Sequence, residues 1–150
     1  MLILFRMKES FSKILPLILF ILIGINLKAQ TNYTADSNEI RTIFSHFESG
    51  LKTGAVKDFS DYLYSETYIS LETGIASHFS ANQSFYILKE YLQHYRPINF
   101  KILKIKTNNG KPYAIGKLVY NKVGIKGESQ VFVSLKQENE KWKIYQITIN

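Results

Sequence analysis

The last forty residues restrict the fold of this chain more than any other segment. They contain three runs rich in β-branched and aromatic residues, at 113–120, 130–135 and 142–149, each bounded by glycine, asparagine or charged residues. Runs of this kind form strands, and polar breaks between them favour hairpins. We therefore expect an antiparallel meander at the end of the domain. Helical patterns come first along the chain, which is the order of a helix-covered, strongly bent sheet.

The first helix is expected to begin at Ser37 or Asn38, because a short side-chain oxygen accepts hydrogen bonds from the free amides of the first turn. Glycine favours helix ends, so Gly50 and Gly54 are expected to terminate it. Apolar residues between these limits recur at helical spacing. They form one stripe: Ile40, Ile43, Phe44, Phe47 and Leu51.

Two further helices are expected. Residues 55–63 fit a short one. Ser80 can cap a longer one that Arg96-Pro97 stops, since a residue before proline is pushed out of the helical region. An apolar stripe predicts the buried face of the longer helix, with Tyr91 at its margin. The stripe contains Phe85, Leu88, Leu92 and Tyr95.

The rest of the chain is predicted to form strands. A short strand covers 67–71, a turn follows at 72–74, and a loop leads to the third helix. Asn108-Asn109-Gly110 fits a hairpin turn because Asn and Gly tolerate positive φ, and a loop is expected around 124–127. The long strands are predicted at 98–107, 113–121 and 129–136, and after a turn at 138–140.

One face of these strands is predicted to meet the helices. Ala114, Gly116, Leu118 and Tyr120 alternate along one strand without a charge, while Lys117 lies on the opposite face. Small Ala114 and Gly116 are expected to let a helix approach closely. The fold class that follows is α+β: three N-terminal helices packed on a strongly curved, mostly antiparallel sheet, forming a cone. The uncharged face of the next strand carries Val131, Val133 and Leu135.

Residues 1–29 have the pattern of a cleavable signal peptide. Basic residues precede an apolar run of twelve residues from Ile14 to Ile25, within the ~7–15 typical of a signal core. Ala29 supplies a small residue at the cleavage point. The alternative is a membrane anchor, but 14–27 holds only fourteen uncharged residues, fewer than the ~20 that span a bilayer. We therefore expect export to the periplasm or outside the cell.

The expected organisation is simple. A signal peptide at 1–29 is followed by a loose leader at 30–36 and a single domain at 37–150. Either Met1 or Met7 can be the start. The chain has no cysteine, which excludes disulfides, thiolate zinc sites, a cysteine nucleophile and a lipid-modified N-terminal cysteine. After cleavage we expect a soluble protein with no stable membrane anchor.

The net charge of +7 is unevenly distributed. Residues 30–100 hold five basic and eight acidic residues, whereas 101–150 hold ten Lys and three Glu. A basic surface can bind an anionic partner such as a lipid headgroup, an acidic glycan or nucleic acid. The simpler interpretation is that Lys decorates exposed sheet faces and discourages edge pairing. None of the ten basic residues is Arg, the better reader of phosphate, so nucleic acid is not an expected partner.

Short patterns carry a family resemblance. They are Phe79-Ser80-Ala81-Asn82-Gln83 with Ile87-Leu88-Lys89, the step from Pro97 to Phe100, Tyr113 to Leu118, and the closing Ile147-Thr148-Ile149. With the element order, they resemble the nuclear-transport-factor-2-like superfamily, a cystatin-like cone. More narrowly, the chain resembles a family of small exported Bacteroidetes proteins of unknown function. It departs from that pattern at 121–129, which leaves the register of this hairpin open. The resemblance implies a fold and export, and no catalytic residues.

Some relatives in that superfamily are enzymes of the ketosteroid-isomerase or dehydratase type, which use a carboxylate or His inside the cone. The corresponding hypothesis here uses His46, Asp61 or Tyr62 as acid or base. The residues themselves favour a protein without catalysis, because the three His lack metal-ligand spacing and the long strands carry no inward carboxylate. No catalytic residue, metal or cofactor is therefore assigned.

Aromatic residues make up 14% of the chain, and they either fill the cone or line a cavity in it. We expect non-catalytic binding of a small ligand or partner protein, through the cone cavity or the outer sheet face, which is also a candidate homodimer surface. Attachment to an envelope surface by the Lys-rich sheet is a further alternative, and predicts salt-sensitive binding to anionic vesicles. The candidate cavity-lining residues are Phe47, Tyr62, Leu88, Tyr91, Leu118, Val133 and Ile147.

Overall fold

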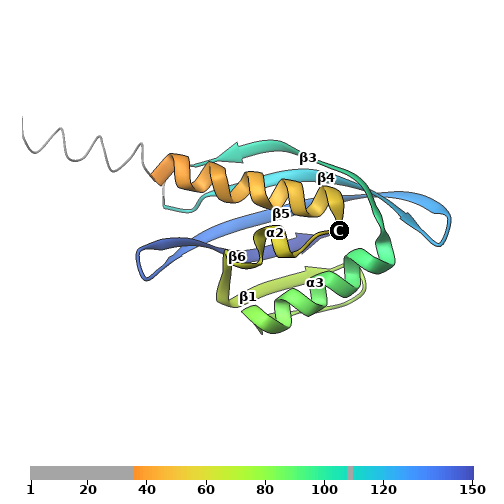
Figure 1. Ribbon diagram of the computed structural model, residues 1–150, viewed down its shortest axis with the longest axis horizontal. Helices are drawn as coiled ribbons and strands as arrows, with labels where there is room; N and C mark the ends of the chain where they lie inside the picture. The colour runs from red at the N-terminus through yellow and green to blue at the C-terminus, as the bar shows by residue number, and fades with distance from the viewer. Residues whose placement is uncertain (1–35, 108–109) are drawn as a thin grey trace, which may run out of the picture. The chain divides into compact units, whose positions relative to one another are not determined.

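The computed structural model of the chain describes residues 36–107 and 110–150. Residues 37–150 form a compact unit built on a six-stranded sheet with the order β2-β1-β6-β5-β4-β3. Helices cover one face of the sheet (Figure 1), which confirms the α+β fold class. The strands are β1 (Leu63–Leu71), β2 (Ala76–Ser80), β3 (Pro97–Lys106), β4 (Tyr113–Lys122), β5 (Ile125–Glu138) and β6 (Lys141–Ile149), and the helices are residues 36–53, α2 (Lys57–Ser60) and α3 (Ala81–Tyr95).

Register shifts bend the sheet around the helices. The pairing of β3 with β4 slips after Pro97 and again after Ile102, and the pairing of β5 with β6 slips after Ser134. Such irregularities place an extra residue in one strand and increase its bend and twist. β1 and β6 run parallel, and the other neighbouring pairs are antiparallel.

The helix over residues 36–53 lies along the inner face of the sheet (Figure 1). Its predicted apolar stripe is confirmed, because all five side chains are at most 1% exposed. Of the two glycines expected to end this helix, only Gly54 does so, with φ of +75° after residue 53. Gly50 remains inside the helix, and its role is packing, because a Cβ there would lie 2.5 Å from the Phe59 ring.

The second helix is shorter than predicted. α2 ends at Ser60 and β1 begins at Leu63, so the strand expected over 67–71 is only the second half of β1. Pairing with β6 explains the difference, since the Ile144 N–H donates to the Tyr62 carbonyl at 2.6 Å and Leu63 pairs with Ile144. A strand partner distant in sequence thus outweighs the local helical pattern.

The loop predicted before the third helix is in fact the edge strand β2. It pairs antiparallel with β1, from Ser80 opposite Glu66 to Ala76 opposite Ser70. Most of its side chains are exposed, so the segment lacks the alternation of apolar and polar residues that identifies a half-buried strand.

Ser80 caps α3 as predicted. Its hydroxyl oxygen accepts from the Gln83 N–H, and its own N–H donates to Gln83 Oε1 at 3.0 Å, which completes a capping box. The helix stops at Arg96, whose φ is +42°. Tyr91 is central to the buried face rather than marginal, while Phe85 is only half-buried. The buried residues of α3 are Ser84, Leu88, Tyr91, Leu92 and Tyr95.

β4 and β5 form a hairpin in unbroken register from Tyr113–Ser134 to Lys122–Ile125. The prediction of a loop around 124–127 is therefore wrong. A two-residue turn at 123–124 joins the strands, and β5 begins at 125 rather than 129.

The inner face of the meander agrees with the predicted alternation, since Ala114, Leu118, Val131, Val133 and Leu135 are all buried. Gly116, however, does not admit a helix. A Cβ at this position would overlap the ring of Phe100 on β3 and lie 2.8 Å from the Lys101 carbonyl oxygen. The small residue makes room for a neighbouring strand's aromatic side chain.

The β5–β6 turn offers a test of backbone strain. Its two central residues, Asn139 and Glu140, have φ of +50° and +64°. Positive φ at both positions favours Asn-Gly, because Gly has no Cβ penalty there. We expect Glu140→Gly to raise the free energy of unfolding by about 0.5–1 kcal/mol, measured by urea denaturation. The matched control is Lys141→Gly in β6, which should lower the free energy of unfolding. A lower free energy of unfolding in Glu140→Gly would show that the backbone at residue 140 is not strained.

The predicted signal peptide, residues 30–35 of the leader, and Asn108 and Asn109 of the predicted turn lie outside the described residues. Within the described residues, no helix combines the length and apolar character needed to cross a bilayer.

Candidate binding site on the outer face of the sheet

A row of side chains crosses the outer face of the sheet, the face opposite the helices. Strand pairing places Tyr68, Gln146, Ser134, Tyr113 and Lys106 side by side, from β1 through β6, β5 and β4 to β3. Their neighbours along the strands, such as Ile147 and Val133, are buried on the inner face. Because successive side chains point to opposite faces, the buried set fixes this row on the outside.

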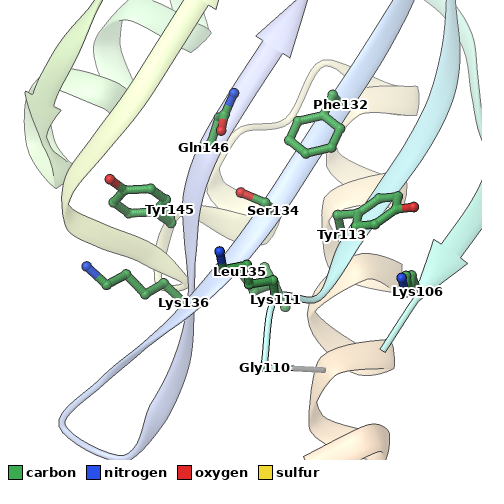
Figure 2. A pocket seen from close by; sticks show the side chains of 10 residues that line it. All are labelled: Lys106, Gly110, Lys111, Tyr113, Phe132, Ser134, Leu135, Lys136, Tyr145 and Gln146. Carbon is green, nitrogen blue, oxygen red and sulfur yellow. The ribbon is translucent and has the colours of Figure 1, made fainter. Parts of the chain in front are cut away.

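Four residues of this row, all except Tyr68, line a half-open trough of about 780 Å³. Figure 2 shows its lining side chains in front of the sheet, with the rings of Tyr113 and Phe132 next to each other. The centroids of these rings are 5.7 Å apart and the planes are inclined by 28°. The trough is lined by Lys106, Gly110, Lys111, Tyr113, Phe132, Ser134, Leu135, Lys136, Tyr145 and Gln146.

The aromatic side chains of the trough are half-buried rather than covered. Tyr113, Phe132 and Tyr145 each keep part of their surface in solvent. Tyr145 also meets Tyr64 edge-on, with centroids 5.5 Å apart, which fixes its orientation. Aromatic rings that are fixed in orientation and remain accessible provide a surface on which a ligand can pack.

The charge of the trough is positive. Lys106, Lys111 and Lys136 line it, and none of the described residues that line it is a carboxylate. Lys136 Nζ lies 5.0 Å from the ring centroid of Tyr145 and 5.4 Å from that of Tyr64, so cation–π contacts hold it beside the rings. In the part of the chain that the structure describes, the one ion pair joins Lys117 to Glu128, neither of which lines the trough.

The predicted cavity-lining residues lie on the other side of the sheet. Tyr62 is half-buried, and the remaining six belong to the core. Phe47 packs there edge-on against Phe59 and Phe100, at centroid distances of 5.0 and 6.0 Å. Tyr91 also lines a smaller pocket of about 330 Å³ between α3 and the β1–β2 turn. None of the seven lines the larger trough.

Hydrogen bonds between polar side chains surround Tyr91 and Tyr95 at this smaller pocket. Glu72 accepts a hydrogen bond from the Tyr91 hydroxyl at 3.2 Å and one from the Ser129 hydroxyl at 3.3 Å. Burial, together with the Glu72 charge, raises the pKa of Tyr91 well above its ordinary value. Tyr91 therefore stays protonated and acts as a donor. Lys122 Nζ donates to the Tyr95 hydroxyl at 2.9 Å, and this bond raises the pKa of Lys122. These contacts hold the β1–β2 turn and β5 against α3.

The residues of the enzyme hypothesis lie at the surface rather than in the core. His46 and Asp61 are exposed and Tyr62 is half-buried, with the His46 and Tyr62 rings 5.3 Å apart. Among residues 36–107 and 110–150, no group of three His, Cys, Asp or Glu side chains could hold a metal ion. The outer sheet face is one of the binding surfaces predicted from the sequence, but sequence reasoning missed the residues of the trough because its candidate residues were all taken from the cavity side. The sequence feature that could have revealed them is the set of outward-facing strand positions, where Tyr113, Phe132 and Tyr145 alternate with buried residues.

A family model described as a domain of unknown function, DUF4783, matches residues 44–150, more than two thirds of the chain. The chain belongs to the DUF4783 family. The predicted resemblance to a family of unknown function is therefore confirmed. The DUF4783 match covers all six strands of the sheet and every residue of the trough.

Solved structures agree with this assignment. A DUF4783 family protein from Bacteroides uniformis superimposes with a TM-score of 0.64 at 15% identity, covering 71% of this chain and 94% of that one. One from Bacteroides ovatus gives 0.60 at 18% identity, with 68% and 88% covered. An NTF-2-like protein of unknown function from Shewanella oneidensis gives 0.52 at 12% identity, with 75% and 96% covered. These likenesses establish the fold. No curated protein matches the chain significantly.

Proposed function

We propose that this DUF4783 protein is a non-catalytic binding protein, exported from the cytoplasm, that holds an acidic oligosaccharide in the trough on its outer sheet face. The observation that carries the proposal is the meeting of half-buried aromatic rings and three lysines in one concavity whose described lining residues include no carboxylate. Export rests on the signal-peptide pattern of residues 1–29.

The rings favour a ligand with a flat, partly apolar body. Tyr113 and Phe132 present a continuous stacked surface, with centroids 5.7 Å apart, on which the C–H face of a sugar ring can pack. Ser134 and Gln146 stand in the same row and offer a hydroxyl and an amide to sugar hydroxyl groups. A few polar groups among apolar walls are the usual composition of a small-ligand site.

The lysines favour a negatively charged ligand. In Figure 2, Lys106 and Lys136 lie on opposite sides of the trough, with Lys111 between them. A ligand carrying one carboxylate per sugar unit can reach more than one ammonium group at once. Clustered charges of one sign also attract such a ligand before contact, an effect that salt weakens.

Two other occupants fit the trough less well. A second copy packed face to face would bring the lysines of both trough surfaces together, and like charges across an interface cost free energy. Single-stranded nucleic acid would find rings for its bases. However, residues 101–150 contain no Arg, and Arg is the side chain that binds phosphate through two hydrogen bonds.

The test is a calorimetric titration of residues 30–150 with a short oligogalacturonate. We expect binding to the unmodified protein and about tenfold weaker binding to Lys106→Gln/Lys136→Gln, since two lost charge contacts of about 0.7 kcal/mol each amount to that factor. The matched control is Lys57→Gln/Lys89→Gln, which removes two exposed lysines from helices and leaves the trough intact.

Three results would contradict the proposal. One is the absence of binding to the acidic probe, and another is equal binding of a neutral malto-oligosaccharide. The third is stronger binding of a single-stranded oligothymidylate, which would identify the trough as a nucleic-acid site. Loss of binding in Phe132→Ala with the lysines intact would support the stacking role of the rings.

A ligand inside the cone is the second candidate. It is favoured by the pocket of about 330 Å³ between α3 and the β1–β2 turn, which the buried rings of Tyr91 and Tyr95 line from the side of the core. If this pocket is the site, Ile87→Trp at its wall should abolish binding of the native ligand, and the lysine variants of the trough should leave it unchanged.

A further inference from the structure

The tip of the β4–β5 hairpin carries two exposed apolar side chains. Val123 is 83% exposed and Ile125 is 73% exposed, the highest values among the large hydrophobic residues of the described chain. Figure 1 shows this hairpin projecting beyond the helices. Single exposed apolar residues are common on protein surfaces, but two at the end of a projecting hairpin form a compact hydrophobic tip.

The backbone of the tip shows that Val123 occupies an unfavourable position. Its φ is +52°, followed by Gly124 at +83°. Positive φ at both turn positions favours Asn-Gly, and a β-branched residue is an outlier there. A strained residue that no core contact requires is a reason to look for a function. What Val123 adds at this position is an apolar side chain in solvent.

The tip is nevertheless held in one conformation. Asn121 Oδ1 accepts a hydrogen bond from the Gly124 N–H at 2.8 Å, and strand pairing continues to Lys122 opposite Ile125. The apolar side chains are therefore presented on a fixed support, so little ordering is needed when they meet a partner.

Positive charge flanks the apolar tip. Lys122 and Lys126 lie on either side of it, and residues 121–127 contain no acid. Glu128, the first acid beyond, pairs with Lys117 at 2.5 Å. Lys122 Nζ is directed back to α3, where it donates to the Tyr95 hydroxyl and lies 4.4 Å from the Tyr95 ring centroid, so Lys126 is the lysine that stands exposed beside the tip. Apolar residues at a tip with lysines behind them match the interface of an anionic membrane, where acyl chains lie beneath negative headgroups.

We propose that the β4–β5 hairpin tip docks reversibly onto an anionic lipid bilayer. Val123 and Ile125 enter the boundary between headgroups and acyl chains, and the exposed Lys126 meets a lipid phosphate. A bilayer is favoured over a protein partner because the tip is a narrow projection with charge complementary to anionic lipid, and a bilayer needs no matching concave surface.

This docking goes beyond the proposed function and does not depend on it. Val123 lies ten residues along the hairpin from Tyr113 of the trough, a separation of about 33 Å at the usual rise of a strand. A hairpin tip on the membrane therefore leaves the trough open to a ligand. Each of the two sites can be tested with variants that leave the other intact.

The experiment is co-sedimentation of residues 30–150 with phosphatidylcholine vesicles, with and without phosphatidylglycerol. This segment omits the apolar residues 14–25 and contains the whole compact unit 37–150 with its core. We expect binding only to the anionic vesicles, and a decrease of at least about tenfold on going from low to physiological salt.

The deciding variant is Val123→Asn/Ile125→Thr, for which we expect at least about tenfold weaker vesicle binding. Its matched control is Ile98→Thr/Leu103→Thr, which removes two apolar residues of β3 that are 52% and 64% exposed, and should bind as the unmodified protein does. Val123→Asn should also raise the midpoint of thermal unfolding, which separates lost binding from lost folding.

Either of two outcomes would overturn the proposal. The first is failure of the unmodified protein to bind anionic vesicles. The second is equal binding by the tip variant, which would assign membrane contact to the lysines of the outer sheet face instead. Selective loss in the tip variant, combined with a weaker salt dependence in Lys126→Gln, would support it.

Discussion

Replacing Phe47 with alanine is expected to lower the free energy of unfolding by about 3–5 kcal/mol, the usual cost of deleting a buried aromatic ring. Phe47 is fully buried on the helix of residues 36–53. Its ring packs edge-on against Phe59 of α2 and Phe100 of β3, so it joins three elements. The loss is a large part of the 5–15 kcal/mol that stabilises a typical domain.

Urea denaturation followed by circular dichroism measures this loss. The control is Tyr86→Ala on α3, where a side chain that is 59% exposed is removed, and the change should stay within about 0.5 kcal/mol. The result also distinguishes a filled cone from an open one. If Phe47→Ala costs less than ~1 kcal/mol, the ring faces open space, and a ligand cavity in the cone becomes the better interpretation.

The sequence was informative wherever a local pattern decides the structure. The stripe from Ile40 to Leu51 and the cap at Ser80 depend on residues within one or two turns of a helix, and the structure confirms both. The inner face of β4 follows from alternation alone. These features need no knowledge of distant parts of the chain.

The sequence-based predictions were wrong where residues far apart in the chain determine the local structure. Residues 61–63 continue a helical pattern, but β6 offers a strand partner and β1 begins there. β2 lies at the edge of the sheet with most side chains exposed, so it has no apolar periodicity to detect. The turn at Val123-Gly124 was missed because valine is an unusual residue at positive φ.

The candidate site was harder to predict than the fold. The sequence-based prediction included the outer sheet face, but its candidate residues were inward ones, such as Leu118 and Val133, and these form the core. The trough draws Lys106, Phe132 and Tyr145 from three strands. Only the register across β3, β4, β5 and β6 brings them together, and register depends on bulges that a single sequence does not reveal.

Replacing Gly116 with alanine is expected to lower the free energy of unfolding by about 2–4 kcal/mol, at or above the usual range for overpacking a core. The added Cβ would overlap the Phe100 ring and lie 2.8 Å from the Lys101 carbonyl oxygen. Backbone of a paired strand cannot move without disturbing the β3–β4 ladder. Gly127→Ala is the matched control, because the three atoms nearest to its Cβ all belong to the far end of the half-buried Tyr120 ring and none to the backbone, and it should cost about 1 kcal/mol or less.

A double-mutant cycle separates the two clashes at Gly116. Phe100→Leu removes the outer part of the ring, so the pair Gly116→Ala/Phe100→Leu should lose about 1 kcal/mol less than the sum of the single changes. Rescue should be partial, since the contact with the Lys101 carbonyl remains. Strict additivity would show that the ring does not occupy the space above Gly116. A single change costing no more than Gly127→Ala would mean that β3 and β4 tolerate a side chain there, contrary to the close packing described above.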